Sequence, residues 1–189
     1  MAQLHIVLGP MFSGKSTYLI NKSRELLNGN YDGNGISSDE ILIINHIFDT
    51  RYSKNCICTH DGVNIPSLSI MNLNDLYTEK SVNFDKIKYI FIDEGQFFND
   101  LFEIVKSLLI KHNKIIYIGG LDGDYKQEPF DKSRLLELIP FANTVIKLNA
   151  RCSVCNNSAP FTKRLTISNE QILVGGSGEY QPVCLNHLL

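Results

Sequence analysis

One stretch near the start of the chain combines the residue types that bind the phosphates of a nucleotide. It reads Gly9-Pro10-Met11-Phe12-Ser13-Gly14-Lys15-Ser16 and matches the pattern G-x-x-x-x-G-K-[ST] in full. The glycines let backbone N–H groups curl around phosphate oxygens, Lys15 can reach the β- and γ-phosphates, and the Ser16 hydroxyl can bind Mg²⁺. A chance match in a turn is the alternative, but an apolar run precedes the stretch and an amphipathic segment follows it. The pattern therefore predicts a site for ATP and Mg²⁺.

Two adjacent acids could supply the next part of such a site. Asp93 and Glu94 directly follow the apolar run 89–92. In proteins with this phosphate-binding pattern, an acid at the end of a strand usually binds Mg²⁺ directly or through water, so we assign Asp93 to the metal together with Ser16. Glu94 points away from Asp93 and could accept a proton from an attacking hydroxyl or water. The alternative is that both acids only cap the following turn.

Potential metal ligands form two pairs near the C-terminus. These are Cys152-x-x-Cys155 and Cys184-x-x-His187. Gaps of two residues let both members of a pair reach one tetrahedral ion, and four protein ligands leave no open position for catalysis. The pairs are farther apart than in common zinc ribbons, a span that a β-hairpin arm holding a loop would close. We predict structural Zn²⁺, with free thiols or a disulfide as alternatives; Cys56 and Cys58 have no matching pair and are expected to be ordinary thiols.

The elements that must position these groups alternate along the first part of the chain. Apolar runs predict strands at 4–8, 41–44, 89–92, 115–118 and 144–148, and apolar spacing predicts helices at 16–28, near 73–80, from about 100 onward and at 135–138. Such alternation is typical of an α/β domain with a parallel sheet flanked by helices. For the helix at Asp100 we expect Glu103 to complete a capping box. Residues 30–39 and most of 50–85 are expected to form loops.

After Arg151 the pattern changes, because cysteines and short β-like pieces replace the long helices. We therefore predict a nucleotide-binding α/β domain at residues 1–150 and a small zinc-binding domain at residues 151–189.

The bulk composition argues against a nucleic-acid or membrane protein. The chain has 189 residues, a formal net charge of −2 and a pI of about 6.2, whereas dedicated nucleic-acid binders are usually strongly basic. No segment approaches the roughly 18 apolar residues of a membrane span. The N-terminus lacks the basic run and apolar core of a signal peptide. We expect a cytoplasmic location, where cysteines bind metals more often than they form disulfides.

Several motifs together resemble those of the cellular and poxviral thymidine kinases. Besides the phosphate-binding stretch they are Asp49-Thr50-Arg51-Tyr52-Ser53, Thr59-His60-Asp61-Gly62, Ile92-Asp93-Glu94-Gly95-Gln96-Phe97-Phe98, Gly120-Leu121-Asp122-Gly123, Pro129-Phe130 and Phe161-Thr162-Lys163-Arg164. Their order and spacing match the family from about Leu4 to His187. The combination is far more specific than any single motif.

The resemblance implies a reaction and a set of roles. These enzymes transfer the γ-phosphoryl group of ATP to the 5′-hydroxyl of thymidine or deoxyuridine. Glu94 matches the catalytic base, with Lys15 and Arg51 stabilising the transferred group. Asp93 and Ser16 match the Mg²⁺ site, and Asp49 lies with Arg51 near the phosphates. From the residues alone, a surface ion pair would be the reading for Asp49 and Arg51.

The resemblance also implies how the nucleoside is bound. In this family the base pocket is closed by a loop, the lasso, which the zinc domain holds, and its backbone groups read the edge of thymine. The matching positions here are Met11, Phe97, Leu121, Tyr125, Phe130, Thr162, Gln171, Ile172, Leu173, Val174, Gly175 and Tyr180. Taken alone, the aromatic positions would be read as core packing. The family also implies a homotetramer.

The sequence departs from the family at a few places. Tyr125 stands where many relatives carry Phe, which adds a hydroxyl near the base. Asn45 and His46 replace a more usual Lys-Tyr pair. His187 replaces a cysteine, and imidazole is a sound zinc ligand.

Three other functions would share some of these features. A nucleic-acid-dependent ATPase would share the phosphate loop, the acidic pair and the zinc site, but the chain has no basic, aromatic-interleaved patch. A degenerate nucleotide sensor is disfavoured by the intact Lys15, Ser16, Asp93 and Glu94. A kinase for a different nucleoside is left open by Tyr125.

Overall fold

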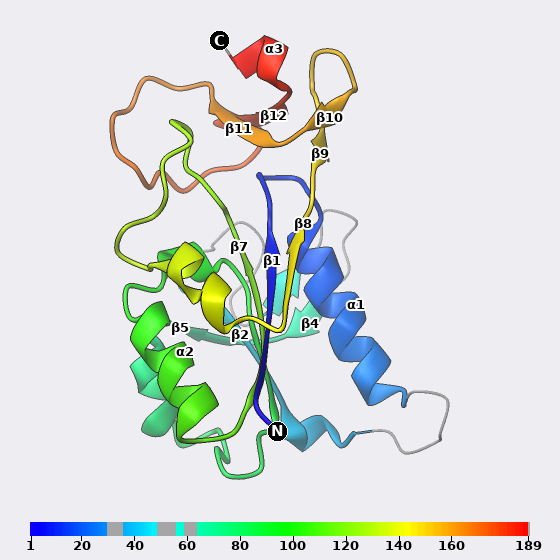
Figure 1. Cartoon of the computed structure of the whole chain (residues 1–189), viewed down its shortest axis with the longest axis vertical. Helices are drawn as coiled ribbons and strands as arrows, with labels where there is room; N and C mark the ends of the chain where they lie inside the picture. Colours follow the sequence, from blue (N-terminus) through cyan, green and yellow to red (C-terminus); the bar gives the residue numbers. More distant parts are fainter. Residues whose placement is uncertain (30–35, 49–55, 59–63, 189) are drawn as a thin grey trace.

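The computed structural model describes residues 1–29, 36–48, 56–58 and 64–188. At its centre is a six-stranded sheet in the order β5-β2-β6-β7-β1-β8, and every neighbouring pair in it is parallel. The strands are β1 (Gln3–Leu8), β2 (Ile41–His46), β5 (Leu68–Ile70), β6 (Tyr89–Ile92), β7 (Ile115–Gly120) and β8 (Thr144–Lys147). The C-terminal ends of parallel strands meet at one edge, and in Figure 1 the last part of the chain lies beyond this edge. The predicted parallel α/β architecture is confirmed.

The central strands bury side chains on both faces, which explains why their sequences are mostly apolar. In β6, Ile90 and Ile92 belong to the larger core, whereas Phe91 between them belongs to a smaller core on the other side. Tyr117 of β7 stacks on Phe91, with ring centroids 4.8 Å apart. Successive side chains of a strand point to opposite faces, so each run supplies both cores at once.

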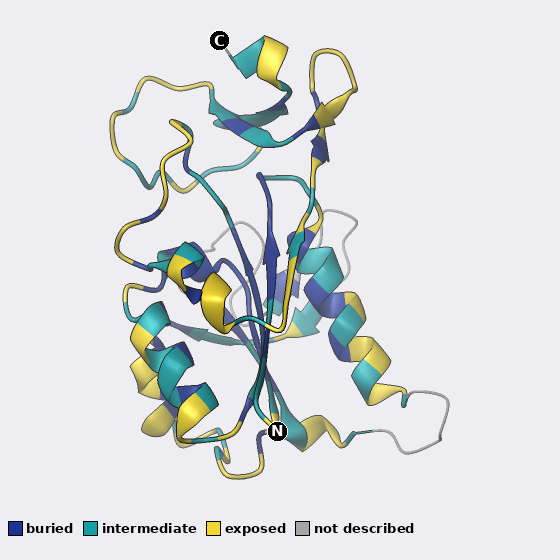
Figure 2. Ribbon diagram, in the orientation of Figure 1, coloured by how far each residue is buried: buried dark blue, intermediate teal, exposed yellow. Residues whose placement is uncertain are grey.

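Helices cover the two faces of the sheet. Helix α1 (Lys15–Leu27) places Leu19 against Phe91 and Tyr117. Helix α2 (Leu101–Ile110) lies on the other face together with the 3₁₀ helices η2 (Leu73–Tyr77) and η4 (Leu135–Phe141). Figures 1 and 2 show α1 and α2 on opposite sides of strands whose residues are mostly buried. None of the helices in the described ranges has the length and apolar character needed to cross a bilayer.

Two expectations about local structure were wrong. Most of 50–85 was expected to be loop, yet β5 adds a sixth strand beside β2, and β3 (Cys56–Cys58) pairs antiparallel with β4 (Asn64–Pro66). These strands are only three residues long, too short to leave a periodic pattern.

The capping box at the start of α2 is the second error. Asp100 is the N-cap, but its side chain makes no hydrogen bond to its own helix. Its carboxylate instead accepts the backbone N–H groups of Leu73 and Asn74, at 3.1 and 2.8 Å. Glu103 pairs with Arg134 at 3.0 Å. Asp100 therefore caps η2, which lies far away in sequence, and not its own helix α2.

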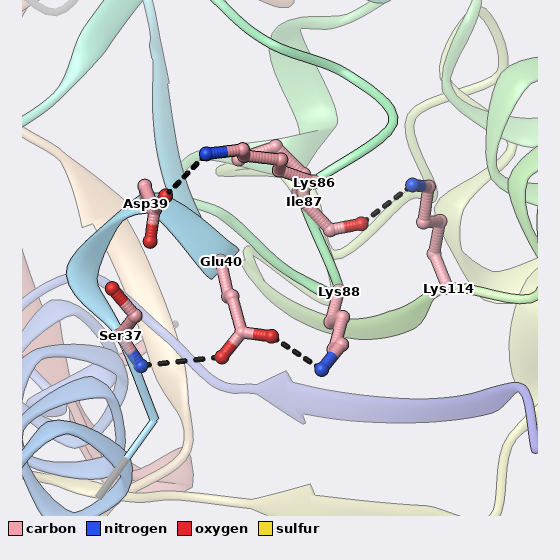
Figure 3. Close-up of polar contacts among 7 residues, drawn as sticks. All are labelled: Ser37, Asp39, Glu40, Lys86, Ile87, Lys88 and Lys114. Carbon is pink, nitrogen blue, oxygen red and sulfur yellow. Dashed lines mark hydrogen bonds and ion pairs between the residues drawn. The ribbon is translucent and has the colours of Figure 1, made fainter.

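A polar network ties loops together at the N-terminal end of the sheet (Figure 3). Asp39 and Glu40, of the short helix η1 (Ser38–Glu40), pair with Lys86 and Lys88. Such exposed pairs contribute little to stability. Lys114 differs, because it is only 6% exposed and donates to the carbonyls of Phe84 and Ile87, at 2.8 and 2.5 Å. Burial lowers the pKa of Lys114, and these two bonds partly replace its lost hydration.

The C-terminal part contains short strands and one turn of helix. They are β9 (Ala150–Arg151), β10 (Ser158–Ala159), β11 (Phe161–Arg164), β12 (Tyr180–Val183) and α3 (Leu185–Leu188). Strands β9 and β10 pair antiparallel, as do β11 and β12, and residues 165–179 connect the second pair. We call residues 165–179 the lasso. A hairpin arm holding a loop was expected from the spacing of the metal ligands, and it is present. A separate small core packs under it, made of Ala150, Cys152, Ala159 and Val183.

Candidate functional site

The phosphate-binding stretch forms the turn between β1 and α1. Gly9 has a φ of 150°, and a Cβ there would lie 2.4 Å from the carbonyl oxygen of Leu148. Only glycine fits this close approach, which lets the chain turn back toward α1. Helix α1 then begins at Lys15, so its N-terminus and positive dipole end face the turn. The predicted order of strand, loop and helix is therefore present.

Two polar groups in this loop suit an anion. Lys15 is buried, and its Nζ donates to the carbonyl of Pro10 at 2.7 Å, which keeps the ammonium beside the loop. The hydroxyl oxygen of Ser13 is buried and makes no hydrogen bond to any described group. An unpaired buried hydroxyl costs free energy unless a ligand or water satisfies it. A triphosphate in the loop would supply acceptors for both residues.

The acidic pair lies at the same edge of the sheet. Asp93 is 1% exposed, and its Oδ1 accepts the backbone N–H of Glu94 at 3.0 Å. It follows β6, whereas Ser16 stands in the first turn of α1 after β1, so both side chains belong to the C-terminal edge. Carboxylate and hydroxyl oxygens suit Mg²⁺, so the donor set fits the predicted metal.

Glu94 has an unusual backbone conformation. Its φ and ψ are 51° and 44°, in the left-handed region, which costs a non-glycine residue about 1–3 kcal/mol. This conformation turns the chain between β6 and the short helix η3 (Gly95–Phe97). The side chain of Glu94 can therefore point in a different direction from that of Asp93. The strain supports a functional reading of Glu94 rather than a simple turn cap.

Gln96 fixes the side chain of Glu94, a contact that the sequence analysis did not find. Its Nε2 donates to Glu94 Oε2 at 2.6 Å, and its Oε1 accepts the N–H of Leu121 at 2.9 Å. Gln96 is 2% exposed. Gly120 permits this arrangement, because a Cβ there would lie 3.1 Å from Gln96 Oε1. Two signals were available in the sequence: Gln96 lies two residues after Glu94, and it belongs to the family motif at residues 92–98.

A single cavity brings together most of the predicted nucleoside-binding residues. It encloses about 430 Å³ of empty space, part of which is open to solvent. The walls are mostly apolar, and Glu94 and Gln96 are among the polar groups. It is lined by Met11, Phe97, Leu121, Phe130, Gln171, Ile172, Leu173, Val174, Gly175 and Tyr180, as predicted, and also by Phe48, Glu94 and Gln96.

Two predicted residues do not line this cavity. Thr162 lies behind it, where its hydroxyl accepts the backbone N–H of Met11 at 2.9 Å. Tyr125 packs one ring face against the Arg164 guanidinium, 3.8 Å from the ring centroid, and its hydroxyl is buried without a described partner. Both therefore act on the cavity wall through another residue. Asp49 and Arg51 lie outside the described residues.

Phe48, also missed from the sequence, is held at the cavity by His46. His46 Nδ1 accepts the N–H of Phe48 at 3.1 Å, and Nε2 lies 3.1 Å from the carbonyl of Met71. Such an arrangement needs the neutral ring with its proton on Nε2. Burial lowers the pKa of His46, although the hydrogen bond to Met71 and the charge of Asp100 oppose the shift.

The four predicted zinc ligands converge on one point. The ligand atoms of Cys152, Cys155, Cys184 and His187 all lie within 4.8 Å of one another. Cys155 and Cys184 have their sulfurs 3.7 Å apart, and His187 Nδ1 is 3.2 Å from Cys184 Sγ and 3.6 Å from Cys152 Sγ. A tetrahedron with Zn–S bonds of about 2.3 Å places its sulfurs about 3.8 Å apart. The cluster therefore fits a four-coordinate Zn²⁺.

Local hydrogen bonds prepare one of these thiols for a metal. Although burial opposes it, backbone hydrogen bonds at Cys184, Cys155 and Val154 lower the pKa of Cys152 to about 6. Burial and the neighbouring cysteines raise the pKa of Cys184. A bound cation would deprotonate both, because thiolate is the form that binds zinc.

Comparison with known proteins identifies the family of the chain. A family model described as thymidine kinase matches residues 2–188. Thymidine kinase a of Arabidopsis thaliana is 36% identical over 187 residues, which are 98% of this chain and 74% of the relative. The thymidine kinase of Yaba monkey tumor virus (strain VR587) is 38% identical over 181 residues, which are 96% of this chain and 91% of the relative. The cytosolic thymidine kinase of Homo sapiens is 36% identical over 182 residues, which are 96% of this chain and 71% of the relative. This chain belongs to the thymidine kinase family and is a nucleoside kinase, a phosphotransferase.

Proposed function

We propose that this chain transfers the γ-phosphoryl group of ATP to the 5′-hydroxyl of thymidine or deoxyuridine and so produces the monophosphate for nucleotide salvage. One observation carries this proposal. The cavity that holds Glu94 at its wall is also lined by Met11, a residue of the phosphate-binding loop. A nucleoside in the cavity would therefore lie beside the phosphates, with a carboxylate available to its hydroxyl.

Each residue has a defined task in this mechanism. The backbone of residues 9–16 and the Lys15 ammonium bind the β- and γ-phosphates. Glu94, oriented by Gln96, accepts the proton of the 5′-hydroxyl as its oxygen attacks phosphorus. Lys15, with Arg51, stabilises the charge of the transferred group. Phosphoryl transfer depends mainly on such positioning and electrostatic stabilisation.

The nucleoside is enclosed under the lasso. Phe97 and Phe130 supply flat apolar walls for a base, and residues 171–175 supply backbone groups for its edge. We propose that residues 151–189 act as a separate small domain whose Zn²⁺ keeps this cover in place. Four protein ligands would leave the zinc without a catalytic position.

Ser16 and Asp93 would hold Mg²⁺, which neutralises charge on the phosphates when it is bound. We also propose a homotetramer in the cytoplasm, a location supported by the printed name of the human relative.

A radiolabel assay tests the reaction and the substrate class together. The purified, zinc-loaded protein is incubated with γ-labelled ATP and Mg²⁺ and with thymidine, deoxyuridine, deoxycytidine or deoxyadenosine. We expect label in thymidine and deoxyuridine monophosphate and far less in the others. Label mainly in deoxycytidine or deoxyadenosine monophosphate would assign a different nucleoside. ATP hydrolysis that DNA or RNA stimulates, without any labelled nucleoside, would contradict the kinase proposal.

Substitution of Glu94 tests the proposed base. Glu94→Gln keeps the size of the side chain but removes the proton acceptor. We expect kcat to fall by about 100-fold or more, as for loss of a general base, while ATP binding changes little. Near-normal turnover of the variant would show that another group accepts the proton.

A further inference from the structure

The lasso has little backbone structure of its own. Among the described residues, its backbone hydrogen bonds occur only at its ends, where Leu165 donates to Glu179, and Glu179 and Tyr180 donate to Gly176. A loop of this length without internal pairing has many accessible conformations, and fixing each residue costs about 1–2 kcal/mol. The wall of the cavity at residues 171–175 therefore needs support from side chains.

Arg164, the last residue of β11, provides most of this support. Its guanidinium donates to three lasso carbonyls: Nη1 to Ser168 at 3.1 Å and Glu170 at 2.5 Å, and Nη2 to Gln171 at 3.1 Å. A planar guanidinium can serve several carbonyls at once in a fixed geometry, which a lysine ammonium cannot reproduce. One side chain thus holds residues 168–171 of the lasso together.

Two aromatic residues fix the guanidinium itself. Its Nε and Nη2 donate to the hydroxyl of Tyr180, at 3.2 and 2.7 Å. That hydroxyl in turn donates to the carbonyl of Leu173 at 2.8 Å. On the other side, the guanidinium lies over the Tyr125 ring at 3.8 Å, close enough for a cation–π interaction. Arg164 therefore reaches Leu173, a residue of the cavity wall, through Tyr180.

Arg164 also links the two walls of the cavity. Tyr125 belongs to the segment after β7 that carries Leu121 and Phe130, and Figure 1 shows this segment rising toward the lasso. The same junction has a second contact, since Gln171 Nε2 donates to Asp124 Oδ2 and to the carbonyl of Pro129, each at 3.1 Å. The guanidinium lies between these walls and lines neither the cavity nor the phosphate loop.

From this arrangement we propose that Arg164 is the positioning residue of the nucleoside site. It sets the shape of the lasso before a nucleoside binds, and so determines nucleoside affinity without contacting the nucleoside. This inference rests on the proposed function only for the identity of the nucleoside; the shape of the lasso does not depend on it.

The experiment compares three variants with the wild type in the radiolabel assay. Arg164→Lys keeps the positive charge but loses the planar guanidinium with its several N–H donors. Arg164→Gln loses the charge as well. Arg151→Gln is the matched control, because Arg151 is exposed in the same part of the chain and makes one weak bond, of 3.4 Å, to the Asn156 carbonyl. We expect both Arg164 variants to raise the thymidine KM by about 10- to 100-fold, as for lost hydrogen bonds to a charged group. The ATP KM and the zinc content should stay close to wild type, and Arg151→Gln should change none of these quantities.

Hydrogen exchange gives a readout that does not depend on activity. In the Arg164 variants, amides of the lasso should exchange faster, whereas amides of β1 and β7 should keep their protection. A uniform loss of protection with unchanged thymidine KM would show a merely structural role and overturn the proposal. Wild-type KM for thymidine in Arg164→Gln would overturn it as well.

A double-mutant cycle tests the path through Tyr180. Tyr180→Phe removes the hydroxyl that joins Arg164 to Leu173. If the two residues act as one unit, the combined loss of thymidine affinity in Arg164→Gln/Tyr180→Phe is smaller than the sum of the single losses. Additive losses would refute the coupling. Should the wild type phosphorylate no nucleoside at all, the proposed function fails, and the hydrogen-exchange comparison still decides the role of Arg164.

Discussion

At the scale of single residues, the site depends on side chains whose partners are backbone groups or distant residues. Gln96 is oriented by the N–H of Leu121 and orients Glu94, and Arg164 collects carbonyls of the lasso. Lys15 could be assigned from the sequence because the phosphate loop is a local pattern, and Asp93 because it directly follows an apolar run. Gln96 and Phe48 could not, because only the fold brings their partners together. A carbonyl that receives a hydrogen bond leaves no mark in the sequence, so the role of Arg164 could not be inferred from it.

Gln96 allows a test of positioning close to the reaction. Gln96→Leu removes both hydrogen bonds while roughly keeping the size of the side chain. We expect kcat to fall by about 10- to 100-fold, the effect of losing a hydrogen bond to a charged group, with little change in the ATP KM. Steady-state kinetics measures both. The control is Gln3→Leu at the far end of the sheet; an equal loss of kcat in this control would refute a specific role for Gln96.

At the scale of elements, the long apolar strands were predicted and the short ones were not. Strands β6 and β7 are buried on both faces and have continuous apolar runs, and β1 is interrupted only by Gln3 and His5. Strand β5 has only three residues and a serine at its centre, a pattern that does not differ from a loop. The predicted capping box is absent because the Asp100 carboxylate can accept N–H groups from its own helix α2 or from η2. Only the folded chain determines that it binds η2.

His46, the last residue of β2, makes the stability of the folded protein depend on pH. The pKa of His46 is lower in the folded protein than its ordinary value of about 6.5. The unfolded chain therefore binds the proton more readily, so the free energy of unfolding falls as the pH drops through about 6.5. We expect urea denaturation to show this loss between about pH 7.5 and pH 5.5.

Substitution of His46 checks the assignment. In His46→Gln the contribution of this ring is absent, and the stability of the variant should depend less on pH than that of the wild type. The control His112→Gln alters a histidine that packs only against Tyr77 and Phe84 among its described ring contacts. An unchanged pH dependence in His46→Gln would assign the effect to other groups.

At the scale of the whole molecule, the phosphate loop follows a strand of the large central sheet. The lasso, which lines the nucleoside cavity, belongs to a C-terminal part with few buried side chains. The core of this C-terminal part is small: only Ala150, Cys152, Ala159 and Val183 of the cluster are buried, and Phe12, Phe161, Cys184 and Leu188 pack against them partly exposed. So small an apolar core does not stabilise a fold by itself. The spacing of the cysteines was enough to predict the metal cluster, because ligand pairs are a local signal, whereas the packing of this part over the sheet edge was not encoded in any local pattern.

Removal of the metal should therefore affect the two substrates unequally. With a strong chelator, or in Cys152→Ser, we expect the thymidine KM to rise about tenfold or more, since disorder in only one or two cover residues costs about 1–2 kcal/mol each. ATP binding should change much less. A metallochromic dye follows zinc release, steady-state kinetics measures the thymidine KM, and nucleotide titration measures ATP binding. Full thymidine affinity in the metal-free protein would contradict the structural role of the site.

The contact between Met11 and Thr162 has a consequence for how the two substrates act on each other. Met11 belongs to the phosphate loop and also lines the nucleoside cavity, and its N–H is bound by Thr162 of β11, the strand that ends in Arg164. We expect a nucleotide in the loop to restrain β11 through this bond, and a nucleoside under the lasso to restrain the loop through the same bond. Such linkage is reciprocal: whatever free energy one ligand contributes to the binding of the other, it receives back in equal amount. We therefore expect a substitution of Thr162 to alter the coupling between the two substrates as well as the affinity for each of them.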